Sequence, residues 1–296
     1  MNDKEYQRAF SKGVEFLENK NYKKAQKLLA ECYLEKKNFR TNFFLFQACY
    51  GQGDFKEARR LGKEYLTEYL SDNKKLDLLI LAGMMAEDVI GTYKLYSHFR
   101  KYMNTTEKKH FFELIKDEES KIDVKRTLEL KKSLLYCGSF PRMRQRRVLQ
   151  DSYSLPLADF REVAPKILCD KNVHQFIKVS ILDDLRQVED SREAPYLFVD
   201  DKLYQIKPSE LHVFEETKLF SALKYQIISE QNDNNDLLRW NEIKLKLSLL
   251  YPFEEKFIGN FRKVKELLML ENMQNYSDAD QNLARKLEKL LVEWSG

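Results

Sequence analysis

Two stretches of the chain carry the same short pattern, one helical hairpin apart. The first runs from Glu15 to Ala25 (EFLENKNYKKA) and the second from Ala48 to Ala58 (ACYGQGDFKEA). Each predicts the end of one helix, a polar turn, an aromatic residue and a second helix that is entered at a small alanine. Ala25 and Ala58 are 33 residues apart, a period typical of stacked helix pairs. The sequence therefore predicts an N-terminal repeat of helical hairpins.

Within this period, small and large residues take complementary places. The first repeat, residues 4–37, has the small Gly13 in its first predicted helix and the large Leu29 in its second. The second repeat, residues 39–71, has Phe46 at the small position and Gly62 at the bulky one. We expect this exchange to fill the same volume. A third, weaker unit at residues 76–102 is broken near Glu87.

This pattern resembles the tetratricopeptide-repeat (TPR) family, whose stacked hairpins work mainly by binding peptides or proteins. The resemblance implies that the first helix of each hairpin lines a concave groove. By alignment, the groove would present Gln7, Phe10, Val14 and Leu17, then Phe43, Gln47 and Tyr50, then Leu81, Met84 and Met85. These side chains could instead pack against neighbouring helices. Family members that clamp a terminal carboxylate use Lys and Asn on this helix, and their absence here argues against that ligand.

The C-terminal half predicts helices with one small hairpin. The segment 137–150 contains Gly138 and Pro141, which interrupt helical continuity, so we predict domains at 1–136 and 151–296 joined by this connector. Residues 196–206 predict two strands around an Asp200-Asp201 turn. Helices are predicted at 157–168, 173–188, 208–230, 237–250, 253–273 and 278–294. Residues 173–182 and 249–255 resemble uncharacterised TPR-containing proteins of Gram-positive bacteria, which implies architecture but no activity.

Charge is divided unevenly along the chain. Residues 1–150 carry 31 Lys/Arg against 21 Asp/Glu, and residues 151–296 carry 20 against 26. Four arginines, Arg142, Arg144, Arg146 and Arg147, stand close together and could contact phosphates or an acidic partner. The alternative is a hinge whose arginines pair with the acidic second half.

Catalytic and metal-binding patterns are not found in the sequence. The nine glycines form no phosphate-binding loop, and the four histidines lack a partner at ligand spacing. The four cysteines form no C-x-x-C pair, so we expect free, mostly buried thiols. We also find no membrane-spanning run and no signal peptide. These observations predict a cytoplasmic protein that is not an enzyme and needs no cofactor or metal.

Together these features predict an all-α fold: a TPR-like right-handed solenoid of helical hairpins, then a helical domain with one β-hairpin. The expected function is a non-catalytic adaptor that holds a protein or peptide in the groove. Two alternatives stay open: a peptide-sensing regulator, and a nucleic-acid-associated protein that uses Arg142 to Arg147.

Overall fold

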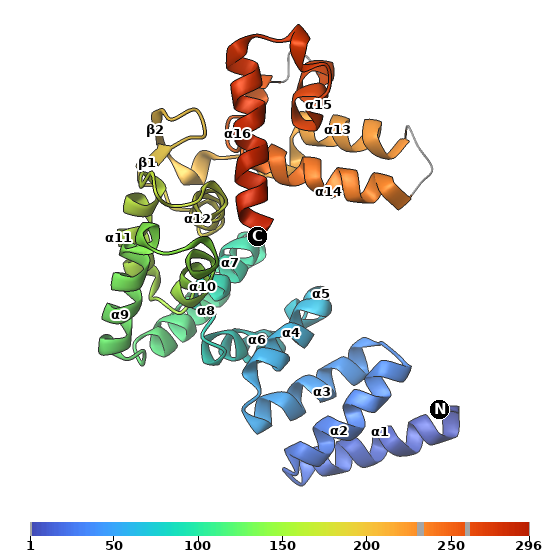
Figure 1. The fold of residues 1–296 in the computed structure, drawn as a ribbon. Coiled ribbons are helices and arrows are strands. Elements are labelled where there is room, and N and C mark those ends of the chain that lie inside the picture. Colours follow the sequence, from blue (N-terminus) through green and yellow to red (C-terminus); the bar gives the residue numbers. More distant parts are fainter. Residues whose placement is uncertain (1, 230–233, 258–260, 296) are drawn as a thin grey trace. The chain divides into compact units, whose positions relative to one another are not determined.

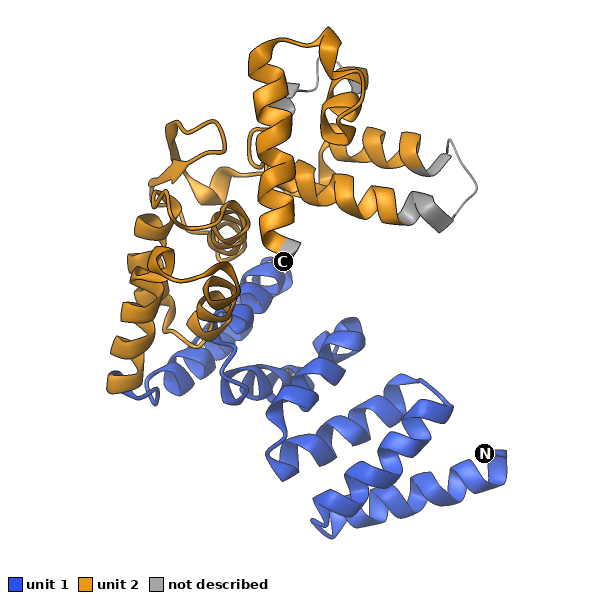
Figure 2. Cartoon of the chain, in the orientation of Figure 1, with its two compact units in different colours: residues 1–124 blue, residues 125–296 orange. Residues whose placement is uncertain are grey.

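The computed structural model describes residues 2–229, 234–257 and 261–295 (Figure 1). The chain forms two compact units, Met1–Val124 and Lys125–Gly296 (Figure 2). The division thus lies between residues 124 and 125, whereas the sequence places a connector at 137–150; the predicted domain limits stay a prediction. Among the described residues, no helix has the length and apolar character needed to cross a membrane.

Unit 1 is built from consecutive antiparallel helices. The first two pairs are α1 (Asp3–Glu18) with α2 (Tyr22–Glu35), and α3 (Phe39–Gln52) with α4 (Phe55–Glu64). A short helix, α5 (Leu66–Leu70), separates them from a third pair, α6 (Asn73–Met85) and α7 (Val89–Phe99). The 3₁₀ turn η1 (Arg100–Tyr102) leads to α8 (Thr105–Glu119), which packs on α6 and α7. This order confirms the predicted all-helical hairpin architecture.

The same turn closes all three hairpins of unit 1. Lys20, Gly53 and Glu87 have positive φ values of 57°, 84° and 61°. Each N–H donates to the carbonyl three residues earlier, and the next N–H donates to the carbonyl five residues before it, at 2.8–3.0 Å. This is the glycine-type C-terminal helix motif. Its recurrence at steps of 33 and 34 residues gives the third hairpin the same turn as the first two.

Helices of unit 1 approach each other closely at two glycines, Gly13 and Gly62. A Cβ at Gly13 would lie 2.9 Å from Leu29 Cγ, so only glycine lets α1 and α2 approach this closely. In the second hairpin, a Cβ at Gly62 would lie 3.5 Å from Phe46 Cε2 and 2.3 Å from Leu79 Cδ1. Phe46 is fully buried. The nearest neighbour of this glycine is therefore Leu79 of the third hairpin, and Phe46 lies at ordinary contact distance, so the expected filling of this space by Phe46 stays a prediction.

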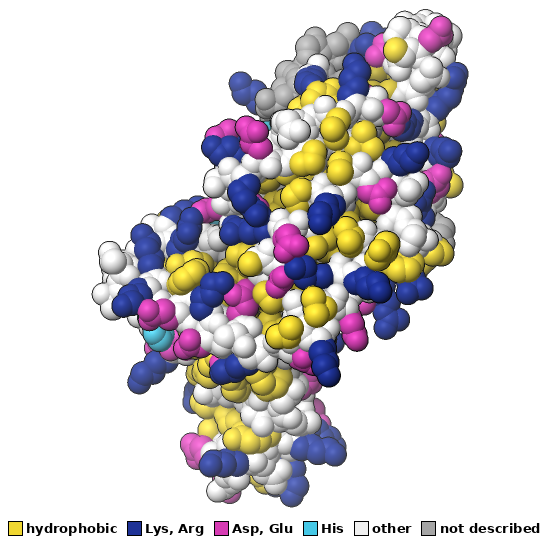
Figure 3. Space-filling view, turned by 90° about the vertical axis from the view of Figure 1, so that its left-hand side faces the viewer, with side chains coloured by type: hydrophobic (Ala, Val, Ile, Leu, Met, Phe, Trp, Pro, Cys, Tyr) yellow, Lys and Arg dark blue, Asp and Glu magenta, His cyan; other side chains and the backbone are white. Residues whose placement is uncertain are grey.

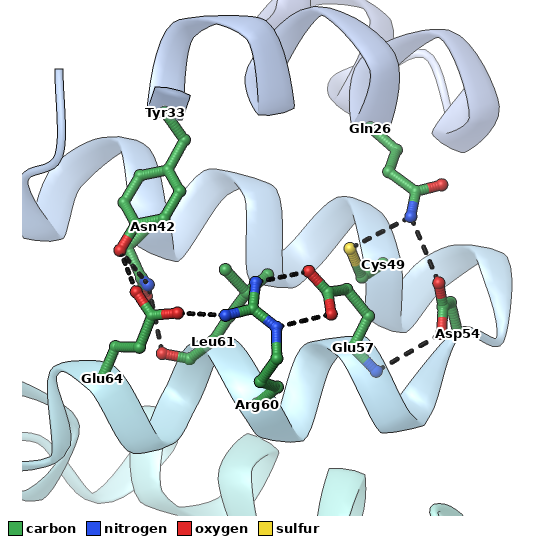
Figure 4. Close-up of polar contacts among 9 residues, drawn as sticks. All are labelled: Gln26, Tyr33, Asn42, Cys49, Asp54, Glu57, Arg60, Leu61 and Glu64. Carbon is green, nitrogen blue, oxygen red and sulfur yellow. Dashed lines mark hydrogen bonds and ion pairs between the residues drawn. The ribbon is translucent and has the colours of Figure 1, made fainter. Parts of the chain in front are cut away.

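A polar network ties the first two hairpins together (Figure 4). The Asn42 amide, fully buried, donates to Tyr33 Oη at 3.3 Å and to the Leu61 carbonyl at 3.1 Å. Tyr69 Oη donates to Asn42 Oδ1 at 3.1 Å, and Tyr33 donates to Glu64. Because these partners come from α2, α4 and α5, the buried amide links three helices to its own helix α3. Its loss would leave buried polar groups without partners.

The second and third hairpins are joined by a buried arginine. Arg59 of α4 is 6% exposed, and its Nε donates to Asp88 Oδ2 at 2.6 Å. Its Nη1 donates to Thr92 Oγ1 at 3.2 Å. The guanidinium passes close to Gly83 of α6 and Gly91 of α7, where a Cβ would lie 2.1 Å from Nη1 and 2.6 Å from Nη2. Two glycines thus make room for this ion pair.

Unit 2 begins with helices α9 (Val124–Leu135), α10 (Arg142–Ser152), α11 (Leu157–Leu168) and α12 (Gln175–Gln187), with the 3₁₀ turn η2 (Cys137–Ser139) before α10. Strands β1 (Ala194–Leu197) and β2 (Leu203–Ile206) follow, and β1 packs on α11. The last part holds α13 (Lys218–Ser229), α14 (Asn234–Ser248), α15 (Phe261–Met269) and α16 (Asp278–Ser295), with 3₁₀ turns η3 (Pro208–Glu210), η4 (Phe214–Glu216), η5 (Glu254–Phe257) and η6 (Met273–Asn275) between them.

Three details of unit 2 differ from the sequence prediction. The helix predicted at 253–273 is one of them, since the structure has the 3₁₀ turn η5 at Glu254–Phe257 and an α-helix only at Phe261–Met269. In the β-hairpin Leu197 pairs with Leu203, and the Phe198 N–H donates to the Lys202 carbonyl at 3.0 Å. Three residues therefore form the turn, and the predicted two-residue turn was wrong. Only Asp201 adopts a positive φ there, 63°, which suits one left-handed position rather than two.

The predicted helix at 208–230 is also wrong in its first half, where the structure has two 3₁₀ turns. The carbonyl of His212 accepts a hydrogen bond from Tyr251 Oη at 3.0 Å, and the Thr217 hydroxyl accepts one from the Phe220 N–H at 3.2 Å. These contacts hold the chain out of a helix until Thr217. Residues 230 and 258–260 of the predicted helices lie outside the described part of the chain.

We expect Gly83→Ala to destabilise unit 1 by about 1–3 kcal/mol, because its methyl group would push the Arg59 guanidinium away from Asp88 and Thr92. Urea unfolding followed by circular dichroism measures this change. The matched background is Arg59→Met, in which the same glycine substitution should cost at least about 1 kcal/mol less. Equal costs in both backgrounds would show that Arg59 does not depend on the space at Gly83.

Candidate functional site

A pocket of about 300 Å³ opens on unit 1. Its lining residues share one property: most come from the first helices of the three hairpins or from the first turn. They are Leu17, Glu18, Lys20, Tyr22, Phe46, Gln47, Tyr50, Gly51 and Leu78. The wall is mainly apolar and aromatic, with a charged residue of each sign at exposed positions. Such a wall with few polar groups is typical of ligand-binding pockets.

Local structure explains why these helices meet at the pocket. α1 lies along α3, whereas α6 packs mainly against α4, α5, α7 and α8. α5 supplies Tyr69, whose ring packs on Phe46 at a centroid distance of 5.1 Å and on Phe43 at 5.8 Å. We infer that this inserted aromatic shifts the third hairpin away from α3, so that Leu78 of α6 faces Gln47 and Tyr50 across a pocket.

Aromatic rings hold the shape of the pocket wall. Phe46 and Tyr50 stack with their centroids 6.2 Å apart, and Phe55 meets Tyr50 edge-on at 5.3 Å. The Tyr22 ring covers the backbone of Gly51, where a Cβ would lie 2.3 Å from Tyr22 Cε1. A side chain at position 51 would therefore displace the Tyr22 ring and change the pocket.

Two polar groups face this apolar wall. Within the described residues, neither the Gln47 amide nor the Tyr50 hydroxyl makes a hydrogen bond to another side chain or to the backbone. Burial raises the pKa of Tyr50, and the negative charge of Glu118 raises it further, so the phenol stays protonated. The pocket thus offers an amide that can both donate and accept, and a neutral hydroxyl group.

The groove residues expected from the sequence fall into three groups. Leu17, Gln47 and Tyr50 line the pocket. Phe10 and Met84 are nearly fully buried, at 4% and 8% exposed, which leaves them little surface for a ligand. The others lie outside the pocket lining: Val14, Phe43 and Leu81 are half-buried, Gln7 is exposed, and Met85 is 48% exposed.

Alignment along the first helices missed six lining residues. Glu18, Lys20, Tyr22 and Gly51 lie in or beside the turns, Phe46 was assigned to packing, and Leu78 stands one turn before Leu81 on α6. The helical spacing of Leu78 and Leu81 could have identified the former. No signal in the sequence marks the turn residues, because their position depends on how neighbouring hairpins stack.

The arginines of α10 contact other parts of unit 2. Arg142 donates to the Asn172 carbonyl at 3.1 Å and pairs with Glu293 at 3.4 Å. The Arg144 guanidinium lies 3.9 Å from the Phe140 ring centroid, and that of Arg146 lies 3.8 Å from the Trp294 centroid. Arg147, 82% exposed, faces Asp151 at 3.9 Å. The run is therefore divided among separate local contacts rather than gathered into one surface.

Charges of both signs also mix on the side of unit 2 that carries α9 and α11. Figure 3 shows Lys and Arg interspersed with Asp, Glu and hydrophobic side chains on this face. Lys131 of α9 pairs with Asp159 at 2.7 Å and with Glu162 at 2.9 Å. Such neighbouring carboxylates would repel a phosphate backbone.

The end of α16 is held by a cluster around His174. The Trp294 ring stacks on the His174 ring at a centroid distance of 5.0 Å, and the Arg146 guanidinium also lies against the Trp294 ring. His174 Nδ1 accepts the Phe176 N–H at 3.2 Å, so Nε2 must donate to the Leu290 carbonyl at 3.1 Å. The contact at Nδ1 requires the neutral ring, because a protonated Nδ1 cannot accept a hydrogen bond. Burial, followed by the positive charge of Arg142, lowers the pKa of His174 from 6.5 to about 4.

Three of the four cysteines have buried thiol groups. Cys32, Cys49 and Cys137 are buried, and Cys169 is exposed. Burial raises the pKa of Cys49 to about 12 and that of Cys137 to about 11. A protonated thiol is a poor nucleophile, so these two cysteines pack in the core as small apolar groups. No cluster of three or more His, Cys, Asp or Glu suited to a metal occurs among the described residues.

Comparison with protein-family models, with curated proteins and with solved structures gave no match. The role of the pocket and of the helical hairpins must therefore be inferred from the geometry of this chain alone.

We predict that the stability of unit 2 falls as the pH drops from about 6.5 to about 4. In this range the unfolded chain binds a proton at His174 and the folded chain does not, so stability rises with pH, by at most about 3 kcal/mol in total. Urea unfolding at pH 7.5 and 5.0 tests this, with Trp240→Phe present so that the fluorescence reports only Trp294.

The control is His174→Asn, which keeps a side-chain acceptor at the helix N-terminus but does not titrate. Its pH dependence should be smaller than that of the parent, since position 174 then takes up no proton. A parent and a variant with the same pH dependence would contradict a neutral His174 in the folded protein.

Proposed function

We propose that unit 1 is a TPR-like repeat domain and that the protein is a non-catalytic adaptor, which binds a protein or peptide on the face formed by the first helices of its hairpins. The observation that carries the proposal is the pocket shared by α1, α3 and α6. A repeat whose first helices together form an open apolar pocket with unused polar groups is suited to recognising another chain.

The repeat itself supports the TPR-like assignment. The three left-handed turn residues recur at 33 and 34 residues, and Ala25 and Ala58, at the entry of the second helices, are fully buried. Gly13 sits where a side chain would collide with Leu29. These are the positions at which the sequence resembles the family.

The nucleic-acid alternative is less well supported. Arg142 and Arg146 contact Glu293 and Trp294 of their own unit, and carboxylates lie among the basic side chains of the α9 face. A nucleic-acid surface needs several cations that can reach phosphates together. The peptide-sensing alternative would use the same pocket and differs only in what the bound peptide controls.

Affinity capture with the full chain tests the adaptor role. Leu78→Glu places a charge on the pocket wall and should reduce retention of the captured partner at least tenfold, because the charge would lose water on binding. The matched control is Leu34→Glu on α2. Leu34 is 79% exposed and outside the pocket lining, so the control should retain the partner. Circular dichroism checks that both variants fold.

A third variant, Arg144→Ala with Arg147→Ala, separates the alternatives. The adaptor proposal fails if Leu78→Glu retains every partner while this variant loses them. A steep loss of binding between 50 and 200 mM salt, as expected for contacts to about 6–10 phosphates, would favour nucleic acid instead.

A further inference from the structure

We propose that the unit 1 pocket takes one large uncharged side chain, aromatic or aliphatic, from an extended peptide segment, and that Gln47 hydrogen-bonds to the peptide main chain beside it. This inference rests on the proposed function, since it specifies what the same pocket binds. It makes a narrower claim, which can fail while the adaptor role stands.

The charge distribution of the pocket selects an uncharged side chain. Leu17, Phe46, Tyr50 and Leu78 form the apolar part of the wall, and Tyr50 stays neutral because the pKa of its phenol is raised. A charged side chain that enters this apolar part of the wall loses water, which costs free energy. The two charged lining residues, Glu18 and Lys20, are exposed and opposite in sign, so they favour neither an acidic nor a basic ligand.

The size of the pocket selects a single side chain. A volume of about 300 Å³ can hold one aromatic or branched side chain. An α-helix with its side chains is roughly 10–12 Å across, so a helical partner would rest over the opening and insert at most one residue. Size alone therefore fixes one inserted residue but leaves the conformation of the ligand open.

Gln47 selects an extended ligand over a helical one. Its amide lies in the pocket lining and makes no hydrogen bond within the described chain. An extended peptide presents a free N–H and a free C=O beside each side chain, and one amide side chain can pair with both. A helix uses these groups internally, which would leave Gln47 buried under the ligand without a partner.

Gly51 leaves room for the Tyr22 ring, which a Cβ at position 51 would meet at 2.3 Å. Both residues line the pocket, so the ring forms part of the wall beside α3, one turn after Gln47 on the same helix.

A peptide series tests the side-chain preference. The probes are acetylated Gly-Ser-Gly-Gly-X-Gly-Gly-Ser-Gly amides with X as Phe, Leu, Ala, Lys or Glu, added to full-length protein carrying labelled leucine methyl groups. Leu17 and Leu78 report on the pocket, and Leu182 in the core of unit 2 is the reference. We expect saturable shifts for Phe and Leu, with affinities at least tenfold higher than for Ala, Lys and Glu.

The proposal is overturned if the Lys or Glu peptide binds as tightly as the Phe peptide, or if no peptide shifts the two pocket leucines. These outcomes are distinct from failure of the adaptor role. Partner capture that depends on position 78, without binding of the Phe peptide, removes only this inference. Capture that is unaffected by Leu78→Glu removes the proposed function itself.

Gln47→Ala tests the main-chain contact separately. This substitution should lower the affinity for the Phe peptide about three- to tenfold, the effect of one lost hydrogen bond. The affinity for toluene, which has a ring and no amide, should not change. An equal loss for toluene would show that Gln47 only shapes the pocket. Unchanged binding of the peptide would show that its main chain does not use this amide.

Discussion

The left-handed residue that closes each hairpin of unit 1 determines how the rest of that unit can pack. Lys20, Gly53 and Glu87 reverse the chain with the same two backbone hydrogen bonds, so each second helix returns at a similar angle to the first. Close approach then requires small residues at the crossing, as at Gly13 beneath Leu29. Because the turn is the same each time, the three first helices meet on one side, where the pocket lies. Two of these turn residues are not glycine, so their left-handed backbone costs some energy, which the packing of the hairpins must offset.

Polar groups, rather than apolar contacts alone, keep successive hairpins in register. An apolar helix face can slide or rotate against its neighbour at little cost, because many arrangements bury similar area. Asn42 and Arg59 do not permit this. Asn42 bonds to Tyr33, Leu61 and Tyr69, and Arg59 bonds to Asp88 and Thr92. Any shift would leave a buried amide or guanidinium without partners, which is costly. The same hydrogen bonds fix the position of the pocket wall, since Phe46 and Tyr50 lie on the same helix as Asn42.

The sequence predicted most of the helices and part of the pocket, and the failures have physical causes. Periodicity of 3.6 residues and the turn pattern are local, so the three helix pairs of unit 1 and the helices α11 and α12 were predicted, whereas the short α5 was not. The predicted turn of the β-hairpin was one residue too short, since Asp200 and Asp201 suit a two-residue turn and a three-residue turn equally well in their local sequence. The region after Pro208 was wrong because Tyr251, some forty residues later, fixes its backbone.

Site residues were harder to predict because a groove residue and a core residue have the same chemistry. Phe10 and Tyr50 both lie on first helices, yet Phe10 is enclosed by Tyr6, Phe44 and Arg40, whereas Tyr50 faces the pocket. Tyr69 of the short helix α5, which no repeat alignment includes, packs on Phe43 and Phe46 of α3 between the second and third hairpins. The arginine run shows the same limit in unit 2. Four cations in six residues suggest an anion site until Glu293 and Trp294, roughly 150 residues away in sequence, are placed beside Arg142 and Arg146. A cluster of charges in the sequence therefore does not establish a binding surface, since its function depends on whether the folded chain already supplies the partners.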